Sequence, residues 1–255
     1  MKRLMILLAV AAATSPLWAI QGTIRTATDS KKGDIKWQSR SKSYAVSFKK
    51  GPTMVSAEYP LADVEELDID KPAGYDKAVE NVKRGNGAAA IGVLTKVVQD
   101  YKMLVWDKPA GRYLVEAYIS ANNAQKAFEI ATSIINEDKS AAWKGDLAPA
   151  YWQALLKLGK TQQLEGLVKK AAISGDRAAS ANALVMRGDM ILASEGTSPE
   201  GLRKALTDAY LRVVLMYDEP CRVARIDAMQ RAADCFDKLG QAARAEQLRS
   251  QARKL

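Results

Sequence analysis

Residues 228–248 read AMQRAADCFDKLGQAARAEQL, and this stretch decides the fold. A helical pattern of apolar residues runs through Ala232, Phe236 and Leu239, stops at Gly240, and resumes after it. Similar turns recur along the last three quarters of the chain. They are Gly85-Asn86-Gly87, Asn122-Asn123, Leu158-Gly159-Lys160, Glu195-Gly196-Thr197 and Leu239-Gly240-Gln241.

The spacing of these turns is nearly constant. The interval is 37 residues from Asn86 to Asn123, from Asn122 to Gly159 and from Gly159 to Gly196, and 44 residues from Gly196 to Gly240. A fixed period in this range, with helical patterning on both sides, indicates stacked helix–turn–helix repeats. We predict five helix pairs. They are 73–84 with 88–101, 107–121 with 124–137, 143–158 with 161–173, 178–195 with 199–217, and 222–239 with 242–253.

Small residues follow the turns at a fixed distance. Five residues after each turn stand Ala90, Ala127, Leu164, Gly201 and Ala245. Antiparallel helices joined by a tight turn need a small residue there, because a large side chain would hold their axes apart. Four of the five positions satisfy this requirement.

On these residues the array resembles the tetratricopeptide-repeat (TPR) family. In the last unit, Ala233, Phe236, Leu239-Gly240 and Ala245 stand where the TPR motif has its small helix A residue, its aromatic residue, its turn glycine and its helix B alanine. The third unit departs from the motif with Trp152 and Leu164, and the fourth with Asp189. The resemblance covers about residues 71–255 and is degenerate, and other αα-solenoids fit nearly as well.

The chain changes character at Lys71-Pro72. Before it, β-branched and aromatic residues alternate with others at period two and read as about five short strands. We predict a small β-meander or open SH3-like barrel over residues 20–70, with residues 59–64 forming the short turn before the last strand. Trp37 and Tyr44 are expected to pack in its core, since so small a module needs its large apolar groups there.

Residues 1–19 have the layout of a secretory signal peptide. Lys2 and Arg3 precede an uncharged run, and polar residues lead to a cleavage position near Ala19. We therefore expect export to the periplasm or beyond. The uncharged run is too short to span a bilayer, which disfavours the alternative of an uncleaved membrane anchor, and no later segment suits a transmembrane helix. The complete order of signal, β module and degenerate repeats resembles exported bacterial proteins of unassigned function.

The composition limits the chemistry. The chain contains no histidine and only two cysteines, Cys221 and Cys235. This removes the usual general base, the commonest zinc ligand and any four-cysteine metal site. On one continuous helix the two cysteines would lie about 21 Å apart, so only a bend after Pro220 would join them in a disulfide, and we favour two separate buried thiols.

Searches for catalytic and cofactor motifs find no nucleophile elbow, no phosphate-binding loop, no dinucleotide fingerprint and no metal-binding helix signature. We therefore predict a protein without catalytic residues, metal or cofactor. An unrecognised hydrolase is the alternative, because a Ser–Lys nucleophile needs no histidine.

The net charge of +9 is unevenly placed. Residues 31–50 carry seven basic residues against one acid, and residues 58–70 carry acids only. We interpret the lysines as solvated side chains. The alternative is a carrier or sensor that binds an anionic envelope polymer or lipid through the basic β module. Nucleic acid is disfavoured, because no nucleic-acid motif is recognisable.

The family resemblance implies a binding face. The first helix of each TPR pair lines a concave surface, at positions 3, 6 and 10 residues before the turn. In the middle units the partner-binding candidates are Arg112, Glu116, Ile119, Gln153, Leu156, Met186 and Met190. This mixed surface, with adaptable methionines and few charges, suits an apolar peptide or helix. The alternative is that half of these residues pack against neighbouring repeats.

We accordingly predict a non-enzymatic scaffold or adaptor of the bacterial envelope, which holds a protein or peptide partner on this face. Binding is expected to depend little on charge. The identity of the partner and the oligomeric state do not follow from the residues.

Overall fold

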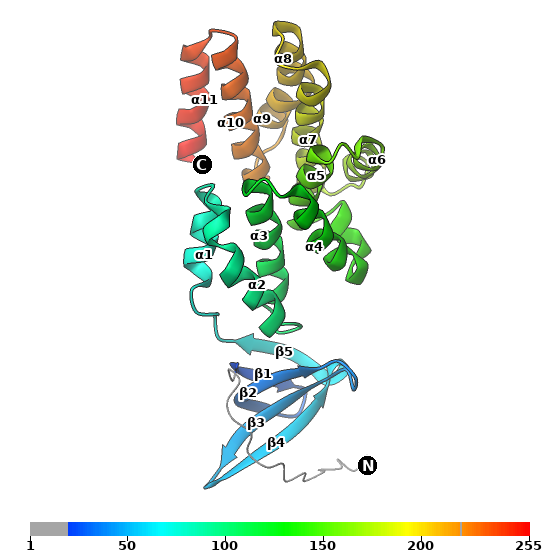
Figure 1. Ribbon diagram of the computed structural model, residues 1–255, viewed down its shortest axis with the longest axis vertical. Coiled ribbons are helices and arrows are strands. Elements are labelled where there is room, and N and C mark those ends of the chain that lie inside the picture. Colours follow the sequence, from blue (N-terminus) through cyan, green and yellow to red (C-terminus); the bar gives the residue numbers. More distant parts are fainter. Residues whose placement is uncertain (1–19, 220) are drawn as a thin grey trace. The chain divides into compact units, whose positions relative to one another are not determined.

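The computed structural model describes residues 20–219 and 221–255, so the predicted signal peptide lies outside the described residues. The chain divides into two compact units, and the division in the sequence falls between Ala117 and Tyr118. The predicted fold class is confirmed, because a small antiparallel sheet precedes a TPR-like series of helix–turn–helix pairs (Figure 1).

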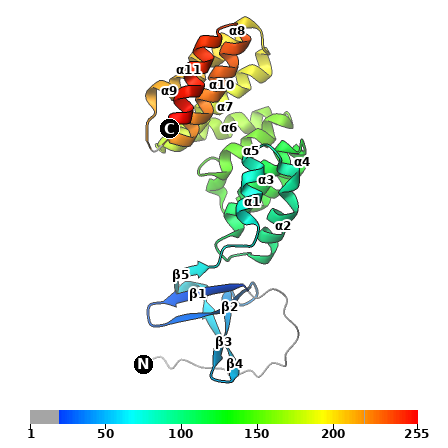
Figure 2. The same cartoon turned by 90° about the vertical axis from the view of Figure 1, so that its left-hand side faces the viewer.

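The first unit begins with five antiparallel strands in the spatial order β4-β3-β2-β1-β5. The strands are β1 (Gln21–Thr26), β2 (Ser30–Gln38), β3 (Ser43–Lys50), β4 (Thr53–Pro60) and β5 (Val64–Ile69). A 3₁₀ turn, Leu61–Asp63, leads into β5, as predicted. Figure 2 shows that β1 and β2 run across β3 and β4, so the sheet is strongly twisted.

Period-two alternation places the apolar side chains on one face of this sheet. The buried residues there are Ile24, Ile35, Tyr44, Val46 and Ile69. Trp37 is half-buried, and its ring centroid lies 4.9 Å from that of Tyr44. Both aromatic residues therefore contribute to the core, as the sequence predicts.

The sheet takes one further core residue from a loop between helices. Leu104 is buried with the sheet residues. On either side of it, the Tyr44 hydroxyl donates to the carbonyl oxygen of Met103 (3.1 Å), and Trp106 Nε1 donates to the carbonyl oxygen of Ile69 (2.9 Å). The boundary predicted at residue 70 stays a prediction, but the core of the sheet extends beyond that residue.

Two residues in this loop have left-handed backbone conformations, Met103 (φ 62°) and Val105 (φ 72°). Such a φ strains a β-branched residue, at a cost of about 1–3 kcal/mol. Val105 is half-exposed, so its side chain gains little from burial in return. The strained backbone on either side of Leu104 places this residue against the sheet.

We expect Val105→Gly to raise the free energy of unfolding by about 1 kcal/mol, because glycine adopts this φ without strain and loses only about 0.5–1 kcal/mol to its greater freedom when unfolded. Val93→Gly in α2 is the control and should lower stability. Urea denaturation measures both changes. A Val105→Gly variant as destabilised as Val93→Gly would contradict the assignment of strain.

The helices follow the predicted pairs closely. The first unit has α1 (Tyr75–Lys83), the 3₁₀ turn Gly87–Ala89, α2 (Ile91–Asp100) and most of α3 (Asp107–Ser120). The second unit has α4 (Ala124–Glu137), the 3₁₀ turn Lys139–Ala142, α5 (Leu147–Lys157), α6 (Thr161–Ala172), α7 (Arg177–Glu195), α8 (Pro199–Ala205), a π-helical segment (Leu206–Tyr210), α9 (Leu211–Met216), α10 (Arg222–Lys238) and α11 (Ala242–Lys254). The helix predicted over 199–217 is thus interrupted by a π-helical stretch.

Each repeat turn contains one left-handed residue. These residues are Gly85, Asn122, Gly159, Gly196 and Gly240, and the first four are 37 residues apart. At Gly240, the glycine N–H donates to the carbonyl of Asp237, and the next N–H donates to that of Phe236. This pair of hydrogen bonds is the pattern of a Schellman cap, and it also ends the helices before Gly85, Asn122 and Gly159. At Gly196 there is one such hydrogen bond, from the Gly196 N–H to the carbonyl oxygen of Leu192.

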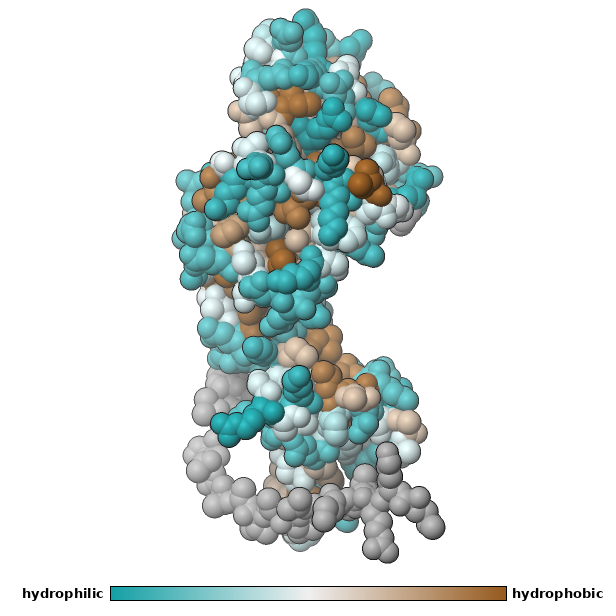
Figure 3. All heavy atoms as spheres, turned by 90° about the vertical axis from the view of Figure 1, so that its right-hand side faces the viewer, coloured by the Kyte–Doolittle hydropathy of each residue, from teal (hydrophilic) through white to brown (hydrophobic). Residues whose placement is uncertain are grey.

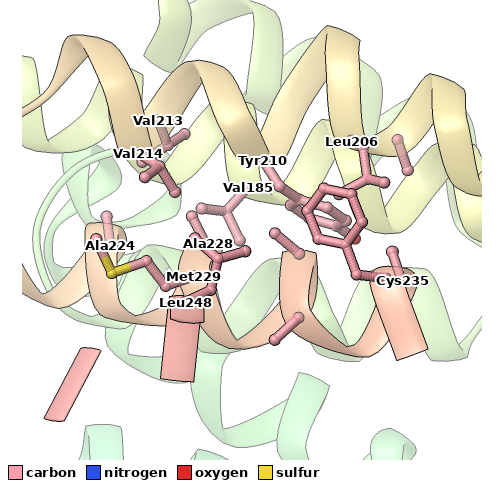
Figure 4. Packing of buried hydrophobic residues seen from close by; sticks show 14 of the residues in the cluster. Val185, Leu206, Tyr210, Val213, Val214, Ala224, Ala228, Met229, Cys235 and Leu248 are labelled. Carbon is pink, nitrogen blue, oxygen red and sulfur yellow. The ribbon is translucent and has the colours of Figure 1, made fainter. Parts of the chain in front are cut away.

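The positions five residues after the turns are all buried, as expected for the closest contact between paired helices. At Gly201 an added Cβ would lie 2.8 Å from the carbonyl oxygen of Gly196. Leu164 is the large exception and is also fully buried. The interior of the second unit continues through residues such as Val185, Leu206, Met229 and Leu248 (Figure 4). Cys221 and Cys235 are both buried free thiols, which confirms that expectation.

Gly159→Ala and Gly166→Ala form a matched pair, because an added Cβ meets open space at both sites. Gly159 has a φ of 65°, whereas Gly166 lies within α6 and has no positive φ. We expect Gly166→Ala to raise stability by about 0.5–1 kcal/mol and Gly159→Ala to lower it by about 1 kcal/mol. Thermal melts compare them, and equal shifts would show that the turn does not need its glycine.

Candidate functional site

A buried carboxylate lies at the centre of the second unit. Asp189 of α7 is only 8% exposed. Its Oδ2 accepts a hydrogen bond from Gln153 Nε2 (2.7 Å), and its Oδ1 accepts from the Tyr210 hydroxyl (2.7 Å) and from Arg231 Nη1 (2.7 Å). The donors come from α5, the π-helical segment and α10. One carboxylate therefore connects four elements of the chain.

Arg231 carries this network outward. Its Nε donates to Asp227 Oδ1 (3.0 Å), one turn earlier on α10. The side chain of Arg231 is 31% exposed and that of Asp227 is 44% exposed, so the network runs from a buried carboxylate to solvent. With two acids and one base, the network carries a formal charge of −1.

The surroundings of Asp189 and Tyr210 shift the pKa values of both groups. Burial raises the pKa of Asp189 above its usual value, whereas the Arg231 charge and the Tyr210 and Gln153 donors oppose this rise. The three donated hydrogen bonds and the positive charge favour the ionised carboxylate against the effect of burial. Burial and the adjacent Asp189 charge raise the pKa of Tyr210, so its hydroxyl stays protonated and donates. The arrangement is a fixed polar contact between helices.

Gly188 makes room for the Tyr210 ring. A Cβ at this position would lie 2.3 Å from the ring, so any other residue would displace Tyr210 from Asp189. Figure 4 shows the Tyr210 ring among Leu206, Val185 and Cys235. Tyr210 ends the π-helical segment within the one repeat whose turns lie 44 residues apart. Interruptions of this kind often occur at functional sites, because they redirect a side chain.

The structure brings part of the predicted face to this network. Gln153 bonds to Asp189 directly, Leu156 follows one turn later on α5, and Met190 adjoins Asp189 on α7. Leu156 and Met190 are half-buried and remain in reach of solvent. We define the α5–α7–α10 face as Gln153, Leu156, Met190, Asp227 and Arg231.

Met186 requires a correction. It is only 3% exposed, so it packs inside the unit and does not lie on an accessible surface. Arg112 and Glu116 lie on α3 in the first unit and pair with each other (Nε to Oε1, 2.9 Å). Ile119 is half-buried on the last turn of α3. None of these three residues belongs to the five that define the α5–α7–α10 face.

The sequence reading missed four members of the network, namely Asp189, Tyr210, Asp227 and Arg231. Asp189 stands 7 residues before Gly196 and Arg231 stands 9 before Gly240, so the rule of 3, 6 and 10 residues selects neither. One signal was available. An acid within the apolar run of α7 must either face solvent or find a buried partner.

Other sites receive less support in the described part of the chain. Residues 20–219 and 221–255 contain no cluster of three or more His, Cys, Asp or Glu side chains placed to hold a metal ion. No helix among them has both the length and the apolar character needed to cross a bilayer.

Known proteins resemble the chain only distantly. A Podosopora anserina kinesin-light-chain-like protein with nearly identical TPR-like repeats is 15% identical to this chain, with a TM-score of 0.41, and the match covers 71% of this chain and 92% of that chain. The structure named MamA MSR-1 C2 is 16% identical, with a TM-score of 0.38 over 72% and 95%. No protein-family model and no curated protein matches the chain. The description of the repeats therefore rests on the helix pairs and turns of this chain.

Arg231→Met tests the network. Removing the guanidinium leaves the Asp189 carboxylate buried without its counter-charge, at a cost of about 3–5 kcal/mol near neutral pH. Without Arg231, the pKa of Asp189 rises further. The variant is then most stable at pH values below the ordinary carboxyl pKa, and it loses stability as the pH rises through the pKa of Asp189 in the folded state. The loss should therefore be larger at about pH 8 than at about pH 5.

Arg249→Met is the control, because Arg249 pairs with Asp234 and Asp237 at the surface. That loss should stay within about 1 kcal/mol. Denaturant titrations at both pH values measure the difference. A pH-independent loss in Arg231→Met would contradict the ionised network.

Proposed function

We propose that this protein is a non-enzymatic scaffold or adaptor of the bacterial envelope, which holds a protein or peptide partner on the α5–α7–α10 face. The observation that carries the proposal is the Asp189 network, which joins the first helices of three successive pairs. A face whose helices are held at fixed positions loses little conformational freedom on binding, so more of its contact energy becomes affinity.

The chemistry of the face suits a peptide segment. Leu156 and Met190 offer half-buried apolar contacts, and methionine adapts to differently shaped partners. Gln153 and Arg231 supply polar atoms that their hydrogen bonds to Asp189 hold in place. This combination fits an apolar segment or an amphipathic helix.

The charged groups of the face are largely satisfied within the protein. Arg231 contacts two carboxylates, and Asp189 accepts from three donors. Binding on this face should therefore respond weakly to salt. The layout of residues 1–19 supports the envelope location.

The basic β module offers less. Lys32, Lys36 and Lys49 are exposed on β2 and β3. The same sheet carries exposed acids on β5, where Glu66 pairs with Arg25 of β1 (2.5 Å). This mixed field would attract an anionic polymer weakly, which favours the helices as the binding surface.

Site-specific photo-crosslinking tests the proposal. A benzoylphenylalanine side chain at Leu156 or Met190, in the cells that make the protein, should capture the same partner at both positions. Gln162 on α6 and Gln247 on α11 are exposed control positions on second helices and should capture it far less. Equal or stronger capture at the control positions would contradict the proposal.

A further inference from the structure

The most exposed large apolar side chains gather in one part of the second unit. Ile173, Leu215, Met216 and Val223 are 76%, 81%, 61% and 75% exposed. Elsewhere in residues 20–219 and 221–255, no exposed large apolar residue exceeds the 54% of Met54. We name these four residues the end patch. In Figure 3, which shows the face on the α6 side, hydrophilic atoms cover most of the surface and apolar atoms appear in separate areas.

The end patch is formed where three segments meet. Ile173 follows α6, Leu215 and Met216 end α9, and Val223 lies in the first turn of α10. Ile173 and Met216 line one cavity of about 260 Å³, together with Ala172, Gly175, Arg177, Ser180 and Tyr217. The guanidinium of Arg177 lies 5.6 Å from the Tyr217 ring centroid and 3.1 Å from Asp218 Oδ1, which ties the segments to one another.

The side chains of the end patch do not contribute to the core of the unit, so packing does not require them to be apolar. Val213 and Val214, the preceding residues of α9, are buried in the core of the unit. Leu215 and Met216 continue the helix with their side chains in solvent. A cluster of such side chains marks an interaction surface.

The charge around the end patch indicates the class of partner. Residues 169–177 and 212–225 contain six basic and three acidic residues. Two of the acids have basic partners, since Asp218 pairs with Arg177 and Asp176 lies 3.9 Å from Lys144 Nζ. Lysine and arginine can also lay their apolar stems along a nonpolar surface while their charges remain in water.

We propose that the end patch docks the protein onto an anionic lipid surface. Aliphatic side chains that protrude separately enter a fluid acyl layer without needing a complementary shape, and the surrounding bases attract anionic headgroups. A protein partner is less well matched, because the cores of protein interfaces favour aromatic anchors, and none of the four exposed side chains of the end patch is aromatic. The docking is separate from partner binding on the α5–α7–α10 face.

Vesicle co-sedimentation of the full chain tests this proposal. Vesicles of phosphatidylcholine containing phosphatidylglycerol should bind the protein, and added salt should weaken the binding. The double variant Leu215→Ser with Met216→Ser should lower the partition coefficient at least about tenfold, because two exposed apolar side chains no longer enter the acyl layer. Both residues are exposed, so the helical circular dichroism spectrum should not change.

Met54→Ser is the matched control, since it removes another exposed apolar side chain and should leave binding unchanged. Arg222→Glu should weaken binding to anionic vesicles. All variants share the same N-terminus, so differences between them report on the substitutions. Equal binding of the double variant, equal binding to pure phosphatidylcholine, or no binding at all would overturn the proposal. So would a dimer in light scattering that the double variant converts to monomers, because the end patch would then join two copies of this chain.

Discussion

The structure of the second unit depends on how one buried carboxylate, Asp189, is neutralised by the groups around it. Asp189 has almost no contact with water, and an isolated charge in such a position would cost several kcal/mol. The three donors that satisfy it belong to three other elements. Each of these hydrogen bonds constrains the relative position of the two elements that it joins. The carboxylate therefore specifies how α5, α7 and α10 align, in addition to the unspecific apolar contacts around it.

This alignment explains local features that otherwise look unrelated. Tyr210 reaches Asp189 because the π-helical segment turns its side chain inward, and because Gly188 leaves space for its ring. The interval of 44 residues between Gly196 and Gly240 contains that segment. The π-helical segment and the longer interval of the fourth repeat thus contribute to one polar contact.

Local conformational demands made much of the fold predictable. A left-handed residue ends the first helix of each pair, and only glycine or asparagine adopts that conformation cheaply, so Gly159 and Gly240 mark their turns in the sequence. Strand alternation similarly placed Tyr44 in the core of the sheet. The Asp189 network was not predictable in this way, because the partners of a buried charge depend on the register between helices. The rule of 3, 6 and 10 residues before the turn likewise placed Met186 on the binding face, although its side chain is buried.

Hydrogen–deuterium exchange under native conditions tests the central claim, that the Asp189 network makes α5, α7 and α10 one cooperative unit. In a repeat array held only by contacts between neighbours, the free energy of opening changes gradually from repeat to repeat. With the network in place, the most protected amides of the three helices should exchange with one common free energy of opening, and Tyr210→Phe should lower all three together. Independent opening of α5, with α7 and α10 unaffected, would contradict the account.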